Sequence, residues 1–217
     1  MKLTPQTELL SLLRDGMSIM AGGFLGCGGP ERLIDLVIES GTQHHTIICN
    51  DTAFVDKSVG RLIVSGCAEK VITSHIGTNP ETGRLLHDGK LTVELVPQGT
   101  LIERIRAGGS GLGGVLTPTG IGTVVEEGKQ KVTIEGKEYL LELPLRADLA
   151  LIKGTICDTL GNVYYKATAR NFNPIMALAA DVVIVEADEI VAQGAIQPEL
   201  VMTPCVLVDY ILKEEAA

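Results

Sequence analysis

Tryptophan is absent from this chain of 217 residues, and the other aromatic residues are only four tyrosines and three phenylalanines. The five cysteines include no C-x-x-C pair, and the four histidines have no ligand spacing relative to cysteines or carboxylates. An odd number of widely spaced cysteines in mostly apolar surroundings predicts reduced core residues, as in a cytoplasmic protein, rather than a disulfide framework. A structural metal site is not expected.

Long hydrophobic runs are also absent. No stretch approaches the ~18 apolar residues of a membrane span, and Met1–Pro5 lacks the hydrophobic block of a signal peptide. The net charge is −9 with no basic cluster, so neither nucleic acid nor an anionic membrane is expected as a partner. A small anion can still bind, because backbone N–H groups and a few local cations act whatever the total charge.

Apolar residues are abundant instead. The set AVILMFWYC makes up 45% of the chain, and counting the 25 glycines as well brings the apolar share to about 57%, where about 45–50% is usual. This composition excludes disorder and predicts a well-buried aliphatic core together with a large subunit interface. The length corresponds to about 1.4 typical domains, so a single domain with an elaboration is expected over residues 1–217.

Short apolar runs alternate with segments of helical periodicity, which is typical of an α/β fold. Because the runs are too continuous for strands exposed on one side, we predict an open, mostly parallel sheet with helices on both faces. Helices are expected at residues 6–14, 30–38, 60–64, 80–87, 101–105 and 174–180, and strands at 17–21, 46–49, 70–73, 91–96, 149–152 and 182–185.

The alternation breaks in the second half of the chain. A glycine-rich loop over 108–122 leads into a β-rich insertion at about 123–145, in which 132–141 has the pattern of a β-hairpin that turns at its Glu-Gly pair. Five of the seven residues 108–114 are glycine, which predicts neither helix nor strand there. A mobile loop that closes over a ligand and a plain connector both fit this composition.

The first candidate site is the segment 15–30, in which an apolar strand ends in a run of glycines and a helix opens at Pro30. Unpaired N–H groups at the strand end and the helix start would face the carboxyl edge of the sheet, where α/β folds bind anions. Only Ala21, Gly23 and Gly26 fit a dinucleotide register, and no phosphate loop is present. A tight turn without a ligand is the alternative.

Polar residues follow the next two strands. Asn50 and Asp51 end one strand, and a polar segment from Ser74 to Asn79 ends the other, so both are expected at the same edge as the glycines. The alternative is that Asp51 and Asn79 cap the following helices. No Gly-x-Ser-x-Gly elbow occurs, and the carboxylates of the hairpin region are explained as solvated surface. The residues alone therefore describe an anion-binding α/β protein without an evident catalytic group.

Residues 15–30, with an Asp-Gly pair, an apolar strand, Gly-Gly-Phe and a final Gly-Gly-Pro, closely resemble the signature of the family I coenzyme A transferases. The likeness is greatest for the α subunits of bacterial transferases that act on acetate, butyrate and acetoacetate. Further segments that match are Asn50–Thr52, Ile76–Pro80, Pro97–Leu101, Arg106–Gly109, Thr117–Gly120, Leu145–Asp148 and Asn171–Pro174.

The resemblance implies a fold of the CoA-transferase and sugar-phosphate-isomerase type. It implies that CoA passes between a short-chain acyl-CoA and a free carboxylate through a glutamyl-CoA thioester. The nucleophilic glutamate then belongs to a β subunit, in a Ser-Glu-Asn-Gly-type motif, and no Glu-Asn-Gly occurs in this chain. The implied assembly is α2β2, with CoA as substrate and no cofactor or metal.

The resemblance also implies which residues of this chain form the site. The CoA-binding residues are expected to be Gly22, Gly23, Phe24, Leu25, Gly26, Cys27 and Gly28. From the strand end and the glycine-rich loop that hold them, Asn50, Asp51, Gly109 and Gly111 are expected at the edge of the active site.

Two other functions remain open: a regulatory domain that binds a phosphorylated metabolite, and a stand-alone sugar-phosphate isomerase. A transferase α subunit would co-purify with a chain of similar size that carries the glutamate motif. A sensor would instead be stable alone, and an isomerase would act unaided.

Overall fold

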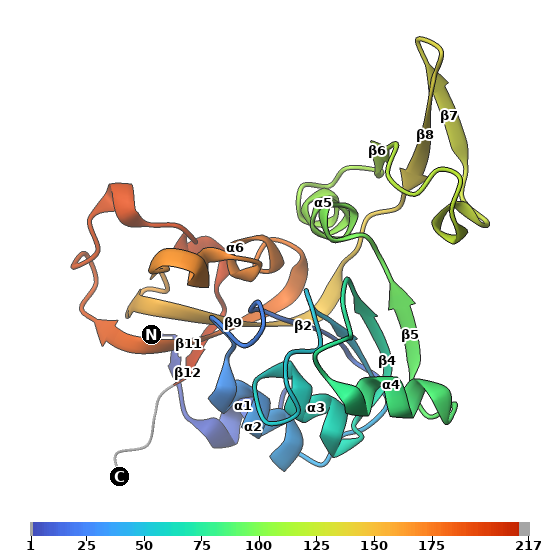
Figure 1. Ribbon diagram of the computed structural model, residues 1–217. Coiled ribbons are helices and arrows are strands. Elements are labelled where there is room, and N and C mark those ends of the chain that lie inside the picture. The colour runs from blue at the N-terminus through green and yellow to red at the C-terminus, as the bar shows by residue number, and fades with distance from the viewer. Residues whose placement is uncertain (1, 213–217) are drawn as a thin grey trace.

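The computed structural model describes residues 2–212, and a nine-stranded sheet runs through that part of the chain (Figure 1). Its strands are β1 (Leu3–Thr4), β2 (Ser18–Ala21), β3 (His45–Ile48), β4 (Ala68–Thr73), β5 (Thr92–Leu95), β9 (Ala147–Asp158), β10 (Val163–Tyr164), β11 (Ala180–Val191) and β12 (Tyr210–Leu212). They lie in the order β1-β12-β11-β9-β2-β3-β4-β5 with every pairing parallel, while β10 pairs antiparallel with β9. The predicted open, mostly parallel sheet is confirmed.

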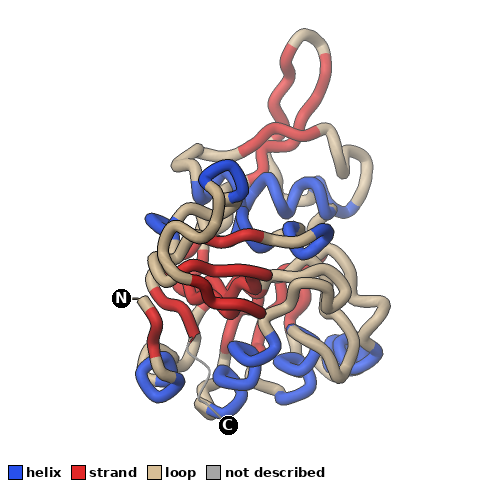
Figure 2. Tube along the Cα trace, turned by 90° about the vertical axis from the view of Figure 1, so that its left-hand side faces the viewer, coloured by secondary structure: helices blue, strands red, loops and turns tan. Residues whose placement is uncertain are grey.

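Helices cover both faces of this sheet, as Figures 1 and 2 show. One face carries α1 (Gln6–Leu10), α2 (Glu31–Glu39), α3 (Val59–Ser65) and α4 (Pro80–His87), and the other carries α5 (Gln98–Gly109) and α6 (Asn173–Met176). Because successive strand residues point to opposite faces, Ile19 and Leu151 pack into the core under α2 and α3, whereas Met20 and Ala150 pack into the core under α5 and α6.

The strands β9 and β11 are twelve residues long and extend far beyond the predicted 149–152 and 182–185. They pair with each other over almost their whole length. Hydrogen bonds between segments distant in the sequence thus continue both strands through Lys153 and Glu186, where the apolar runs stop. The periodicity of the sequence cannot predict this pairing, because the two strands are distant in the chain.

Two predicted helices are shorter than expected. The helix predicted at 174–180 ends at Met176, because β11 already begins at Ala180. The helix predicted at 6–14 ends at Leu10, after which single turns closed by i→i−3 hydrogen bonds continue to Leu13.

A second, three-stranded sheet projects from the α5 side of the molecule (Figure 2). It consists of β6 (Val115–Thr117), β7 (Lys131–Ile134) and β8 (Lys137–Glu142), in the order β6-β8-β7. The β7–β8 turn holds Glu135 at φ +50° and Gly136 at φ +76°, as a two-residue hairpin loop requires. The predicted hairpin is confirmed.

The helix α5 contradicts the prediction of no helix in 108–114, because it continues through Gly108 and Gly109. A Cβ on Gly108 would lie 2.2 Å from the Leu145 carbonyl oxygen, and one on Gly109 would lie 2.5 Å from Leu178 Cβ. Close packing of the helix end therefore requires glycine here, and this contact outweighs the low helix propensity of glycine.

All five cysteines are free thiols. Cys49, Cys67 and Cys157 are buried as expected, whereas Cys27 is exposed and Cys205 is only partly buried, which corrects the expectation of core residues for these two. Burial raises the pKa of the Cys49 thiol to about 12, which makes it unreactive at neutral pH. Within residues 2–212 no helix is long and apolar enough to span a membrane, and no cluster of His, Cys, Asp and Glu is suited to a metal ion.

Candidate functional site

The loop of residues 22–29 joins β2 to α2 at the carboxyl edge of the sheet, and we call it the glycine loop. Its tip is a tight turn in which the Phe24 N–H donates to the Cys27 carbonyl at 3.0 Å and the Cys27 N–H donates back at 2.8 Å. The two central residues, Leu25 and Gly26, have φ values of +49° and +83°. The turn is therefore of the two-residue hairpin kind, and glycine fits its second position without strain.

Only part of the loop backbone is free for a ligand. The amides of Phe24 and Cys27 are used within the turn, and the Leu25 amide donates to Asp51 Oδ2 at 3.0 Å. Among residues 2–212 the amides of Gly23, Gly26 and Gly28 have no hydrogen-bond acceptor. These three N–H groups are the part of the predicted site that no other group of the described chain occupies.

The start of α2 is already occupied by an acidic side chain. The Arg32 and Leu33 amides donate to Glu186 Oε2 at 2.8 and 3.1 Å, and Glu186 is buried in β11. The sequence predicts these first helical N–H groups as part of an anion site, and the structure corrects this. A protein carboxylate fills the position that a ligand phosphate takes at other helix N-termini.

Two asparagines ahead of and at the start of α6 hold the glycine loop from behind. Asn173 Nδ2 donates to the Gly28 carbonyl at 3.0 Å, and Asn171 Nδ2 donates to the Cys27 carbonyl at 2.9 Å. A Cβ on Gly22 would lie 1.8 Å from Asn173 Oδ1, so the loop must begin with glycine. Sequence reasoning assigned neither asparagine a role, because their positions relative to the loop depend on the β9–β11 pairing.

Asn50 and Asp51 lie against the loop, where the sequence places them. Asp51 accepts from the amides of Leu25 and Ala53 and from Asn50 Nδ2, at 3.0, 2.8 and 2.6 Å. Asp51 thus anchors the loop, and its alternative interpretation as the cap of α3 is wrong. For Asn79 the capping interpretation is confirmed, since its side chain accepts from the Glu81 amide in α4.

An open cavity of about 610 Å³ borders the loop, lined by Phe24, Cys27, Thr168, Arg170 and Asn171. Its volume is that of a small-molecule site. The underside of the loop is tightly packed in contrast, with a gap of only about 10 Å³ between the loop and the end of β3. The space for a ligand therefore lies beside Phe24 and Cys27 and not beneath the loop.

Gly109 and Gly111 lie elsewhere. The helix α5 begins near Asn50, to which Gln98 Nε2 donates at 2.7 Å, and then runs back along the sheet. Its end packs Gly109 against Leu178, immediately before β11 starts. The structure therefore places both glycines at the amino ends of the strands and not beside the glycine loop.

These features define an open α/β fold with a glycine loop at its carboxyl edge, and comparison with known proteins gives its class. The family described as "Coenzyme A transferase" matches residues 4–214. The chain belongs to the coenzyme A transferase family, as its sequence predicts. This membership sets aside the sensor and the sugar-phosphate isomerase.

Two bacterial relatives are particularly similar to this chain. The acetate CoA-transferase subunit alpha of Escherichia coli K12 is 59% identical over 211 residues, which cover 97% of this chain and 96% of the relative. The acetoacetyl-CoA:acetate/butyrate CoA transferase alpha subunit of Clostridium acetobutylicum is 56% identical over 209 residues, 96% of each chain. Both are named alpha subunits, which implies a partner subunit.

Solved structures agree on the fold. The acyl-CoA transferase of E. coli O157:H7, solved as a thioester complex with CoA, superposes with a TM-score of 0.86 at 21% identity. The superposition covers 98% of this chain and 47% of that protein, so this chain spans about half of its length. Glutaconate coenzyme A-transferase from Acidaminococcus fermentans gives a TM-score of 0.85 at 17% identity, over 98% of this chain and 75% of that one.

Proposed function

We propose that this chain is the α subunit of a heteromeric enzyme that transfers CoA between a short-chain acyl-CoA and a free carboxylate. The observation that carries the proposal is the glycine loop, with its unpaired amides at Gly23, Gly26 and Gly28, in a member of the coenzyme A transferase family. The names of the two similar relatives favour acetate, butyrate and acetoacetate as the carboxylates.

The chemistry needs an oxyanion site. An enzyme carboxylate attacks the thioester carbonyl of the acyl-CoA, and the resulting anhydride forms as CoA thiolate leaves. The thiolate then attacks the enzyme's carbonyl and releases the donor acid, which leaves a glutamyl-CoA thioester; the acceptor carboxylate reverses both steps. Each attack creates a tetrahedral oxyanion, which preorganised N–H donors stabilise. We propose residues 22–28 as the CoA-binding loop that supplies such donors.

The nucleophile is proposed to come from the partner. The carboxylate that contacts the loop in this chain, Asp51, is buried and accepts three hydrogen bonds, so its oxygens are committed to holding the backbone. A glutamate on a β subunit completes the site, and we propose a cytoplasmic heterotetramer of two α and two β subunits. CoA is a substrate in this scheme, and no metal or other cofactor takes part.

Isotope exchange between acetyl-CoA and labelled acetate tests the proposal. The purified chain alone is expected to give no exchange, and addition of the β subunit is expected to produce ping-pong exchange. Borohydride should then reduce the thioester on the β subunit. A CoA adduct on this chain, or turnover by this chain alone, would contradict the assignment. Dialysis of the complex against a chelator is expected to leave the rate unchanged.

A further inference from the structure

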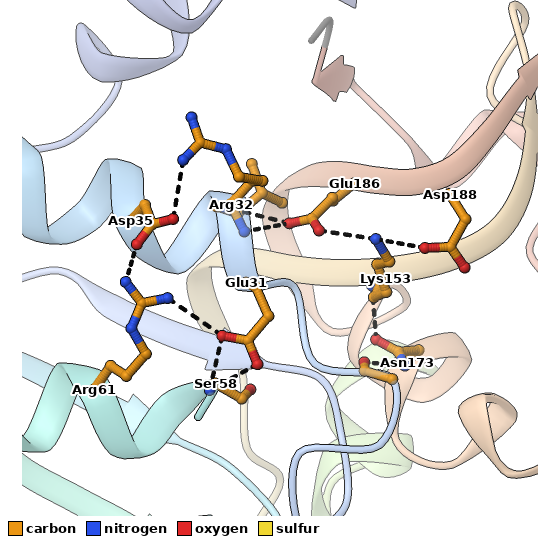
Figure 3. A network of polar contacts seen from close by, with 11 residues as sticks. Glu31, Arg32, Asp35, Ser58, Arg61, Lys153, Asn173, Glu186 and Asp188 are labelled. Carbon is orange, nitrogen blue, oxygen red and sulfur yellow. Dashed lines mark hydrogen bonds and ion pairs between the residues drawn. The ribbon is translucent and has the colours of Figure 1, made fainter. Parts of the chain in front are cut away.

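An ionic cluster, buried at Glu186 and exposed at Asp188, lies beneath the junction of the glycine loop and α2 (Figure 3). Lys153 of β9 and Glu186 of β11 are register partners, and Lys153 Nζ is 2.8 Å from Glu186 Oε1 and 2.8 Å from Asp188 Oδ1. Burial alone would lower the pKa of Lys153, but its hydrogen bonds to Asp188 and Glu186 outweigh burial and raise it. The ammonium group is therefore charged at every physiological pH.

The position of this cluster follows from strand geometry. Every second residue of a strand shares one face, so Lys153 continues the row of Leu149 and Leu151, and Glu186 continues the row of Ile184. Both rows are apolar where the body of α2 packs over them. They become charged beside the first turn of α2, beyond which the helix no longer covers the strands. The charges thus face the helix N-terminus rather than the core.

Contacts from β9 and β11 reach both ends of the loop. At the α2 end, Glu186 Oε2 accepts from the Arg32 and Leu33 amides. At the other end, Gly22 packs directly against Asn173, whose Oδ1 accepts from the Lys153 backbone amide at 3.0 Å; Asn173 Nδ2 also holds the Gly28 carbonyl. The loop therefore spans two fixed points that both depend on β9 and β11.

A separate set of contacts fixes α2 to α3 (Figure 3). Glu31 accepts from the Ser58 amide at 2.9 Å and pairs with Arg61, which also pairs with Asp35. These side chains lie on the α3 side of the helix, and the Glu186 pair lies on the sheet side. The sheet-side pair connects the helix start to the strands next to the loop.

We propose that Glu186 and Lys153 are positioning residues that set the glycine loop in the geometry required to bind the CoA ester, an inference that rests on the function proposed for that loop. Glu186 acts by filling the anion position at the start of α2. The phosphates of CoA are thereby excluded from that helix terminus, and the substrate must be held by the loop amides. Lys153 acts by keeping the buried carboxylate neutralised.

The test uses the assembled complex with Glu186→Gln and Lys153→Met in this chain. The glutamine keeps an oxygen that can accept hydrogen bonds from the first amides of α2. Its side-chain NH2 group is a donor, however, and cannot pair with the Lys153 ammonium. Glu142→Gln is the matched control, because Glu142 is also buried and pairs with Lys129 at 2.6 Å, but in β8, away from the loop. Amide hydrogen exchange over residues 22–33 and full ping-pong kinetics are measured for each complex.

Both positioning variants are expected to exchange the amides of residues 22–33 at least ten-fold faster and to raise KM for the acyl-CoA at least five-fold. The kcat should fall at least five-fold as well, because the same amides are proposed to stabilise the oxyanions, whereas the KM for the acceptor carboxylate should change by less than two-fold. The Glu142→Gln complex should match the wild type in all of these measurements. Wild-type exchange and KM in both positioning variants would overturn the proposal, as would an equal effect of Glu142→Gln.

The wild-type complex separates this inference from the function on which it rests. Addition of CoA should slow exchange at residues 22–28 if the loop binds it. No change on addition of CoA would contradict the proposed function of the loop. If CoA does not change the exchange rate, faster amide hydrogen exchange in the Glu186→Gln complex would still show that Glu186 positions the loop.

Discussion

Substitution of Gly22 by alanine is a strong test of how the glycine loop is built. The added methyl group would lie 1.8 Å from Asn173 Oδ1 and 2.7 Å from its Cγ, which no rotation of a Cβ can relieve. The side chain of Asn173 must leave its position. It would give up three hydrogen bonds, to the Lys153 amide and to the carbonyls of Gly28 and Ala169.

The expected cost follows from those three bonds. At about 1 kcal/mol each, their loss destabilises the protein by about 3 kcal/mol. For a chain of this size that corresponds to a fall in Tm of roughly 6 to 12 °C. The Gly28 carbonyl also loses its donor, so kcat/KM of the complex with its β subunit should fall together with the Tm.

A double-mutant cycle tests the stated cause. Asn173→Ala removes the same three bonds, so Gly22→Ala in that background should cost almost nothing further. Gly26→Ala is the control, since its Cβ would meet only Lys57 at 3.6 Å and the cost is the ~1 kcal/mol of a left-handed φ. If the effects of Gly22→Ala and Asn173→Ala add in the double variant, the clash is not the cause and the reasoning is refuted.

Three further predictions concern other parts of the chain. Gly23→Val should lower kcat/KM about a hundred-fold or more by displacing an amide donor, and unchanged kinetics in a normally assembled complex would contradict this. Iodoacetamide at pH 8 should alkylate the exposed Cys27 and leave Cys49 unmodified, since burial raises the pKa of Cys49 to about 12; peptide mass spectrometry measures both. Hydrogen bonds from the Ser18 hydroxyl and amide lower the pKa of Asp148, so its stabilising contribution is present at neutral pH and is lost as the pH falls below ~3.9; Asp148→Asn should flatten the acid side of a Tm-against-pH curve.

Features that depend on neighbouring residues can be predicted from the amino-acid sequence alone. The alternation of apolar runs and helical periods predicts β2, β3, β4 and β5 and the helices α2 to α4 at nearly their observed bounds. The Glu135-Gly136 turn and the cap at Asn79 are equally local, because a turn or a cap involves residues only a few positions apart. The glycines after β2 likewise indicate a loop with positive φ.

Only the tertiary structure decided which groups of that loop are free. Whether an amide is available depends on acceptors that come from other elements, such as Asp51 from the end of β3 and Glu186 from β11. Glu186 interrupts an apolar run and therefore marks the end of a strand in the sequence, yet parallel pairing with β9 carries the strand past it. Gly109 shows the reverse case, since contact with Leu178 places a glycine inside a helix that local propensity disfavours. Local periodicity encodes the secondary structure, but a hydrogen-bond partner or a steric contact 26 to 154 residues away is defined only when the strands are in register.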